Sequence, residues 1–171
     1  MCGIAGLLNY HGINEDPSTP FNIKAASALI SIERRGPDDC GEWDDGICWL
    51  GHRRLSVVDL TASGHQPMRR GNLIISFNGM IYNFACLRER LMGLGHKFWS
   101  KTDTEVILAG WQEWGVDLLP RLNGMFAIAI WDTKDRVLTL ARDRFGKKPI
   151  FWRQWKGGIA FGSRLDTVEA L

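Results

Sequence analysis

The segment Met1-Cys2-Gly3-Ile4-Ala5-Gly6-Leu7-Leu8 decides how the rest of the sequence is interpreted. Its apolar run over residues 3–8 is typical of a short strand buried on both faces. If Met1 is removed, Cys2 becomes the first residue, and an α-amino group has an ordinary pKa of about 7.7–8.0, low enough to accept a proton near neutrality. A thiol and a base on one residue are what amine-assisted nucleophilic catalysis requires. Alternatively, Cys2 is a small apolar residue at the start of a buried strand.

Outward from this strand, the hydrophobic pattern predicts an α+β fold in which buried strands are flanked by two or three helices. A polar loop over 9–18 leads to a helix that starts at Thr19-Pro20, and an Asp-Gly turn within Trp43–Ile47 joins two strands as a hairpin. Further helices start at Asn83 and at Thr102 or Asp103. The remaining expected strands are 73–77, ended by Asn78-Gly79, and a meander of 124–131, 136–142, 149–155 and 159–163.

Composition limits the class of protein. With 171 residues, 45% of them hydrophobic, and a net charge of +2, the chain matches one ordinary globular domain and not a generic nucleic-acid binder. No apolar run approaches the ~20 residues of a membrane span, so we expect no membrane partner. The four cysteines form no C-x-x-C pair, which argues against a metal site. Reduced thiols and the lack of a recognisable targeting segment favour a cytoplasmic location.

Three polar side chains and one backbone N–H could serve a nucleophile at Cys2. Asn78 and the Gly79 N–H could donate hydrogen bonds to an oxyanion, although Asn-Gly is also an ordinary turn. Arg54, which precedes the strand-like run Leu55–Asp59, could bind a substrate carboxylate through two parallel hydrogen bonds. Asp103 could bind an ammonium group, although its local role is that of a helix N-cap. Each local interpretation is the simpler one when its residue is taken alone.

Taken together, seven segments resemble one family from residue 1 to about residue 165. The chain resembles the N-terminal glutaminase domain of asparagine synthetase-type class II glutamine amidotransferases, which are N-terminal-nucleophile hydrolases. The segments are Met1-Cys2-Gly3-Ile4-Ala5-Gly6, Arg35-Gly36-Pro37-Asp38-Asp39, Gly51-His52-Arg53-Arg54-Leu55-Ser56-Val57-Val58-Asp59, Asn78-Gly79-Met80-Ile81-Tyr82-Asn83, Thr102-Asp103-Thr104-Glu105-Val106-Ile107, Leu122-Asn123-Gly124-Met125-Phe126-Ala127 and Arg142-Asp143-Arg144-Phe145-Gly146.

The resemblance implies a fold, a reaction and a set of roles. The fold is a four-layer αββα sandwich, in which two antiparallel sheets lie between helical layers. The reaction is the hydrolysis of L-glutamine to glutamate and ammonia through a γ-glutamyl thioester on Cys2. The implied roles are the nucleophile for Cys2, the oxyanion hole for Asn78 and the Gly79 N–H, carboxylate binding for Arg54, ammonium binding for Asp103, and backbone contacts to the substrate for Leu55 and Val57.

The resemblance also implies partners. Residues 1–171 are expected to be a glutaminase domain excised from a longer chain, whose C-terminal ATP-dependent synthetase domain receives the ammonia in cis. ATP and magnesium are implied only for that domain, because no Ser-Gly-Gly-x-Asp-Ser phosphate loop occurs here, and no cofactor or metal is expected in this one. Family members often pair, so a homodimer is possible.

One position departs from the family pattern. The family usually has glutamate at position 80, where this chain has Met80. The loss of that carboxylate predicts weaker glutamine binding, with Asp103 left to hold the ammonium group. A glutaminase-fold binding or regulatory module with impaired turnover is the alternative interpretation.

Overall fold

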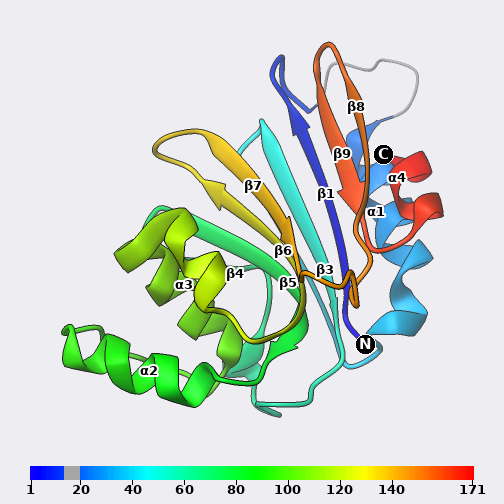
Figure 1. The fold of residues 1–171 in the computed structure, drawn as a ribbon. Helices are drawn as coiled ribbons and strands as arrows, with labels where there is room; N and C mark the ends of the chain where they lie inside the picture. The colour runs from blue at the N-terminus through cyan, green and yellow to red at the C-terminus, as the bar shows by residue number, and fades with distance from the viewer. Residues whose placement is uncertain (14–19) are drawn as a thin grey trace.

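Two antiparallel β-sheets packed face to face form the centre of the molecule in the computed structural model, which describes residues 1–13 and 20–171 (Figure 1). The strands are β1 Gly3–Asn9, β2 Asp39–Asp44, β3 Cys48–Arg54, β4 Met68–Arg70, β5 Leu73–Ile81, β6 Gly124–Asp132, β7 Val137–Arg142, β8 Phe151–Trp155 and β9 Gly158–Gly162. The helices are α1 Phe21–Ser31, α2 Phe84–Gly93, α3 Asp103–Trp114 and α4 Leu165–Ala170, with short 3-10 turns at Glu33–Arg35, Ala62–Gly64 and Gly115–Arg121.

The first sheet has the strand order β2-β3-β1-β9-β8, so the N-terminal strand lies at its middle. Residues 3–8 of β1 are all buried, as expected for a strand covered on both faces. Gly6 lies against the ring of Phe161, and a β-carbon at this position would overlap that ring. The central place of β1 fixes the position of Cys2, which immediately precedes it.

The second sheet has the order β4-β5-β6-β7, and β5 is its longest strand together with β6. The sequence predicts that Asn78-Gly79 ends this strand, and that prediction is wrong. Asn78 pairs with Ala127 and Gly79 pairs with Phe126, so the ladder continues to Ile81. Pairing with β6 overrides the local turn preference of an Asn-Gly dipeptide.

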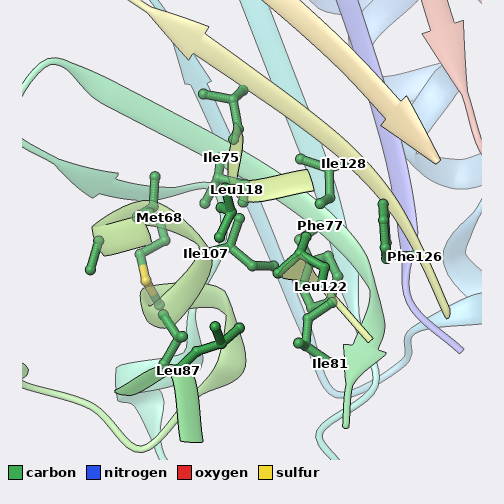
Figure 2. Close-up of a cluster of buried hydrophobic side chains, with 14 of the residues drawn as sticks. Met68, Ile75, Phe77, Ile81, Leu87, Ile107, Leu118, Leu122, Phe126 and Ile128 are labelled. Atoms are coloured by element: carbon green, nitrogen blue, oxygen red, sulfur yellow. The ribbon is translucent and has the colours of Figure 1, made fainter. Parts of the chain in front are cut away.

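Three hydrophobic clusters separate four layers and confirm the αββα sandwich. One lies between the second sheet and the helices α2 and α3, where Phe77, Ile107 and Leu118 meet (Figure 2). A second fills the space between the two sheets and includes Ile4 and Trp131. The third lies between the first sheet and the helices α1 and α4. In the described part of the chain, no helix is long and apolar enough to span a bilayer.

Several expected elements differ from those observed. The last four strands do not form one meander, because β6–β7 belong to the second sheet and β8–β9 to the first. Residues 55–59 are an irregular loop after β3 and not a strand. Pro20 is the N-cap of α1 and not its first helical residue, while Thr19 and the expected loop over 14–18 lie outside the described residues. The hairpin around Gly46, whose φ is +84°, is confirmed.

Candidate active site

A cavity of about 150 Å³ opens where β1, β3 and β5 and the start of α3 come together. All the site residues that the sequence predicts line this one cavity, although they come from four separate stretches of the chain. These residues are Cys2, Arg54, Leu55, Val57, Asn78, Gly79 and Asp103.

The Cys2 side chain is held by the backbone of Leu55. The Leu55 N–H donates to Cys2 Sγ at 3.4 Å, and the thiol lies 3.6 Å from the Leu55 carbonyl oxygen, to which it can donate. Arg35 Nε donates to the Cys2 carbonyl at 3.0 Å, which fixes the backbone on the other side. Burial raises the pKa of the Cys2 thiol, and the Leu55 N–H and the charge of Arg54 act against this rise. Since Met1 precedes Cys2 in the structure, the Cys2 nitrogen is a peptide amide there.

Asn78 carries an unused hydrogen-bond donor at the cavity. Its side chain is almost completely buried, and its Nδ2 has no hydrogen-bond partner among the described residues. A buried polar atom without a partner is costly, so its presence beside a cysteine indicates that a ligand atom completes it.

The Gly79 N–H lies on the free edge of β5. Along this strand, the N–H groups of Phe77 and Ile81 point away from β6 and donate to Gln66 Oε1 and Asp103 Oδ2, at 2.7 and 3.0 Å. Because backbone directions repeat every two residues in a strand, the N–H of Gly79 points to the same side. A β-carbon at Gly79 would lie 2.3 Å from the Met125 carbonyl oxygen, so the strand requires glycine here.

Arg54 ends β3 and is only 7% exposed, with its guanidinium against the loop that follows. It donates from Nη1 to the Thr61 carbonyl at 2.9 Å and from Nη2 to the Asp59 carbonyl. Gly64 allows this position, since a β-carbon there would overlap the guanidinium. Two loop carbonyls thus orient the cation, and its remaining N–H groups are available to a carboxylate in the cavity.

Asp103 is the first residue of α3, and Thr102 is the N-cap, with its Oγ1 accepting from the Glu105 N–H at 3.1 Å. The carboxylate of Asp103 accepts from the N–H of Ile81 and of Thr104, both at 3.0 Å. Burial raises the pKa of Asp103. A cationic group in the cavity would compensate the cost of burying this carboxylate.

Several cavity residues were not singled out from the sequence. Gln66 supports β5 through Phe77 and donates from Nε2 to Thr104 Oγ1 at 3.3 Å, while Met125 and Lys148 contribute to the wall. A glutamine, a methionine and a lysine carry no local signal of such a role. Within residues 1–13 and 20–171, no group of three or more His, Cys, Asp or Glu side chains is placed to hold a metal ion.

This geometry and the comparison with known proteins lead to one family. Residues 1–171 match the glutamine amidotransferase domain family, and the chain belongs to it. The chain is similar to asparagine synthetase [glutamine-hydrolyzing] 3 of Bacillus subtilis, with 37% identity over 99% of this chain. It is also similar to a putative asparagine synthetase [glutamine-hydrolyzing] of Mycobacterium tuberculosis, with 40% identity over 99% of this chain. The chain spans 28% of the length of each of these relatives.

Solved structures support the fold. The glutamine phosphoribosylpyrophosphate amidotransferase of B. subtilis, solved with ADP and GMP, superposes with a TM-score of 0.79 at 20% identity. The superposition covers 99% of this chain and 43% of that one. Together with the two sheets and their helical layers, this similarity shows that the chain shares the fold of that amidotransferase.

Proposed function

We propose that residues 1–171 are the glutaminase domain of an asparagine synthetase-like amidotransferase and hydrolyse L-glutamine to glutamate and ammonia. The observation that carries the proposal is the presence of the Cys2 thiol and the unpaired Asn78 Nδ2 in the same cavity. A thiol nucleophile beside a free amide donor is the arrangement that acyl transfer requires.

The chemistry starts with removal of Met1, which frees the α-amino group of Cys2. The neutral amine takes the thiol proton, and the sulfur attacks the side-chain carbonyl carbon of glutamine. The negative charge that develops on the carbonyl oxygen is stabilised by Asn78 Nδ2 and the Gly79 N–H. The amine then returns the proton to the departing nitrogen, ammonia leaves, and a γ-glutamyl thioester remains on Cys2. Water hydrolyses the thioester, which releases glutamate and restores the thiol.

Charged groups at two sides of the cavity select an α-amino acid. Arg54 binds the α-carboxylate and Asp103 binds the α-ammonium group, while the backbones of Leu55 and Val57 contact the substrate. Met80 also lines the cavity, so an apolar side chain stands beside the ammonium site. Asp103 is therefore the carboxylate that carries ammonium recognition.

The proposal extends to the longer protein. Since the chain spans 28% of the length of its curated relatives, we infer that it works in cis with a C-terminal synthetase domain. The ammonia passes to that domain, where ATP and magnesium activate the acceptor carboxylate. A homodimer and a cytoplasmic location are the further expectations.

The test measures the intact mass of the purified protein before and after treatment with an electrophilic glutamine analogue. We expect a mass that lacks one methionine and a single adduct that Cys2→Ala abolishes. Cys86→Ala is the matched control, because Cys86 is a free but exposed cysteine and its loss leaves the adduct in place.

Glutamate release from glutamine provides the second measurement. The protein lacking Met1 should release glutamate, and Cys2→Ala should not. If protein lacking Met1 takes no adduct and releases glutamate no faster than Cys2→Ala, the catalytic proposal is wrong and the domain is a binding or regulatory module.

A further inference from the structure

Lys148 places a buried ammonium group in the wall of the cavity that holds Cys2. The residue is only 4% exposed and lies in the connection between β7 and β8, which runs beside the N-terminus (Figure 1). Burying an ammonium group is costly unless an opposite charge or several acceptors surround it. The cost of burying Lys148 therefore suggests that its positive charge acts on a group in the cavity.

The connection is built to hold its lysine in place. The carboxylate of Asp143 accepts four backbone N–H groups, those of Phe126, Phe145, Lys147 and Lys148, at 2.9–3.1 Å. Backbone donors thus occupy both oxygens of Asp143, which acts as the centre of a rigid turn. The same turn points Lys147 to solvent and Lys148 into the cavity.

Lys148 forms no ion pair with an acidic side chain in the described part of the chain, although the negative charge of Asp143 acts on it from a greater distance. Its Nζ donates to Met1 Sδ at 2.9 Å, and a thioether is a weak, neutral acceptor. This contact places the ammonium group next to the residue that is removed when Cys2 becomes the N-terminus. The charge of Cys2 also acts on Lys148, so the amine freed at Cys2 is formed in the electrostatic field of this lysine.

Other charges also face Cys2. Arg35, from the 3-10 turn after α1, donates to the Cys2 carbonyl, and Arg54 approaches from the end of β3. Asp103, at the start of α3, contributes the opposite charge. With Lys148, three cations and one carboxylate surround the nucleophile, which favours the neutral amine and the thiolate.

We propose that Lys148 is a positioning residue that supplies a fixed positive charge beside Cys2, keeping the freed amine unprotonated and the sulfur ready to ionise. This inference rests on the proposed function only in taking Cys2, with a free α-amino group, as the nucleophile. Burial and the charge of Arg35 lower the pKa of Lys148, while the negative charges of Cys2 and Asp143 act against this fall. The ordinary pKa of lysine is more than two units above that of an α-amino group, so Lys148 is the group that retains its proton.

The first experiment measures kcat/KM for glutamine hydrolysis against pH, on protein whose loss of Met1 is verified by mass. In Lys148→Met, we expect the acidic limb of the profile to shift to higher pH by about one unit, because the amine of Cys2 is protonated more easily when the neighbouring positive charge is lost. Lys148→Arg retains the charge and should keep the wild-type limb. Lys147→Met is the matched control from the same turn and should also leave the limb in place. If the acidic limb of the kcat/KM profile lies at the same pH in Lys148→Met as in wild type, the proposal is wrong, even if the variant hydrolyses glutamine more slowly.

The second experiment needs no glutamine. The rate of Cys2 alkylation by iodoacetamide is followed against pH in a Cys40→Ser, Cys86→Ser background, which removes the two exposed thiols. We expect the pH at which the alkylation rate of Cys2 is half-maximal to rise in Lys148→Met. This pH midpoint should stay at the wild-type value in Lys148→Arg and Lys147→Met. If glutamine is not hydrolysed but the midpoint rises, the proposed function fails and this inference stands; a constant midpoint overturns the inference. Should Lys148→Met not fold, Lys148→Gln gives the same comparison.

Discussion

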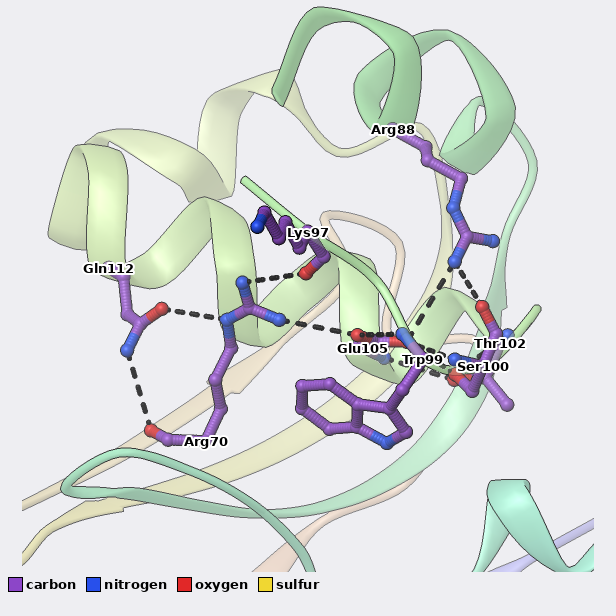
Figure 3. Close-up of polar contacts among 8 residues, drawn as sticks. All are labelled: Arg70, Arg88, Lys97, Trp99, Ser100, Thr102, Glu105 and Gln112. Carbon is purple, nitrogen blue, oxygen red and sulfur yellow. Dashed lines mark hydrogen bonds and ion pairs between the residues drawn. The ribbon is translucent and has the colours of Figure 1, made fainter. Parts of the chain in front are cut away.

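Two acids that lie two residues apart in α3 have opposite surroundings. Glu105 is fully buried, and its carboxylate accepts from the backbone of Trp99 and Ser100, from the Ser100 hydroxyl and from Arg70, with Arg88 at 3.8 Å (Figure 3). Asp103 is also buried, but among the described residues its carboxylate accepts from the backbone N–H groups of Ile81 and Thr104, and it faces the cavity.

The difference indicates that Glu105 has a structural role, whereas the charge of Asp103 is available to a ligand. Glu105 is surrounded by donors because its role is to tie the loop before α3 to Arg70 and Arg88. Asn78 Nδ2 has no hydrogen-bond partner among the described residues, and the Asp103 carboxylate, which accepts one backbone N–H at each oxygen, faces the cavity. A folded protein tolerates such unsatisfied groups where a substrate completes them.

The largest expected effect tests the structural side of this comparison. Glu105→Gln leaves Arg70 and Arg88 without their buried counter-charge, and we expect the free energy of unfolding to fall by about 3 kcal/mol. Urea unfolding measures the loss. Glu113→Gln is the control, since Glu113 pairs with His96 near the surface and its loss should cost less than about 1 kcal/mol. Equal losses in the two variants would remove the structural role assigned to Glu105.

Asn78→Ala tests the ligand side. Removing this proposed oxyanion donor should lower kcat for glutamine by about 10²–10³-fold. The free energy of unfolding should hardly change, because Nδ2 has no partner to lose among the described residues. Asn72→Ala is the control from the other end of β5, where the side chain donates to Asp132 at 2.6 Å. That control should lose stability and retain kcat; the reverse result would contradict the comparison.

Met80→Glu sharpens the comparison by adding a second carboxylate to the cavity. A charge-assisted contact contributes about 1.5–3 kcal/mol, so KM for glutamine should fall at least about tenfold while kcat changes little. Met92→Glu introduces the same charge at an exposed position of α2 and should leave KM unchanged. An unchanged KM in Met80→Glu would show that position 80 does not contact the ammonium group.

The smallest expected effect concerns the pH dependence of stability. Burial raises the pKa of Asp103, so the folded state binds its proton more tightly than the unfolded state does. The protonated Asp103 therefore adds to the free energy of unfolding at a pH below the ordinary pKa of aspartate. This contribution is lost as the pH rises through the pKa that Asp103 has in the folded state. Asp103→Asn removes this loss, so the variant should gain stability relative to wild type between pH 4 and pH 7. Urea unfolding across this range that shows no relative gain would contradict the assignment.

The sequence predicts the fold where the pattern is local and fails where it is not. Strand β1, the hairpin at Gly46 and the cap at Thr102 follow from apolar runs, a turn dipeptide and a capping hydroxyl. Which sheet each later strand joins depends on where the connection over 143–150 crosses the molecule, and the strand patterns themselves do not carry this information. The continuation of β5 through Asn78-Gly79 is hidden from the sequence for a related reason, because the pairing partners Ala127 and Phe126 lie far away along the chain.

The candidate site was predictable to the extent that motifs mark it. Cys2, Arg54, Asn78 and Asp103 belong to segments with a recognisable order, and the structure gathers them in one cavity. Lys148 could not be found in this way. Lys147 and Lys148 are chemically identical neighbours in the sequence, and only the turn around Asp143 makes one of them exposed and the other buried.

The central place of β1 has a consequence for how the protein is made. Ala5 pairs with Gly162, so the strand that follows Cys2 cannot be completed until the ribosome has synthesised nearly the whole domain. At about 5–20 residues per second, the N-terminus remains outside its sheet for on the order of ten seconds. A methionine aminopeptidase can act on an extended chain during this interval, before the first residue is enclosed. The topology thus leaves Met1 accessible during synthesis, before the cavity of the proposed nucleophile is assembled.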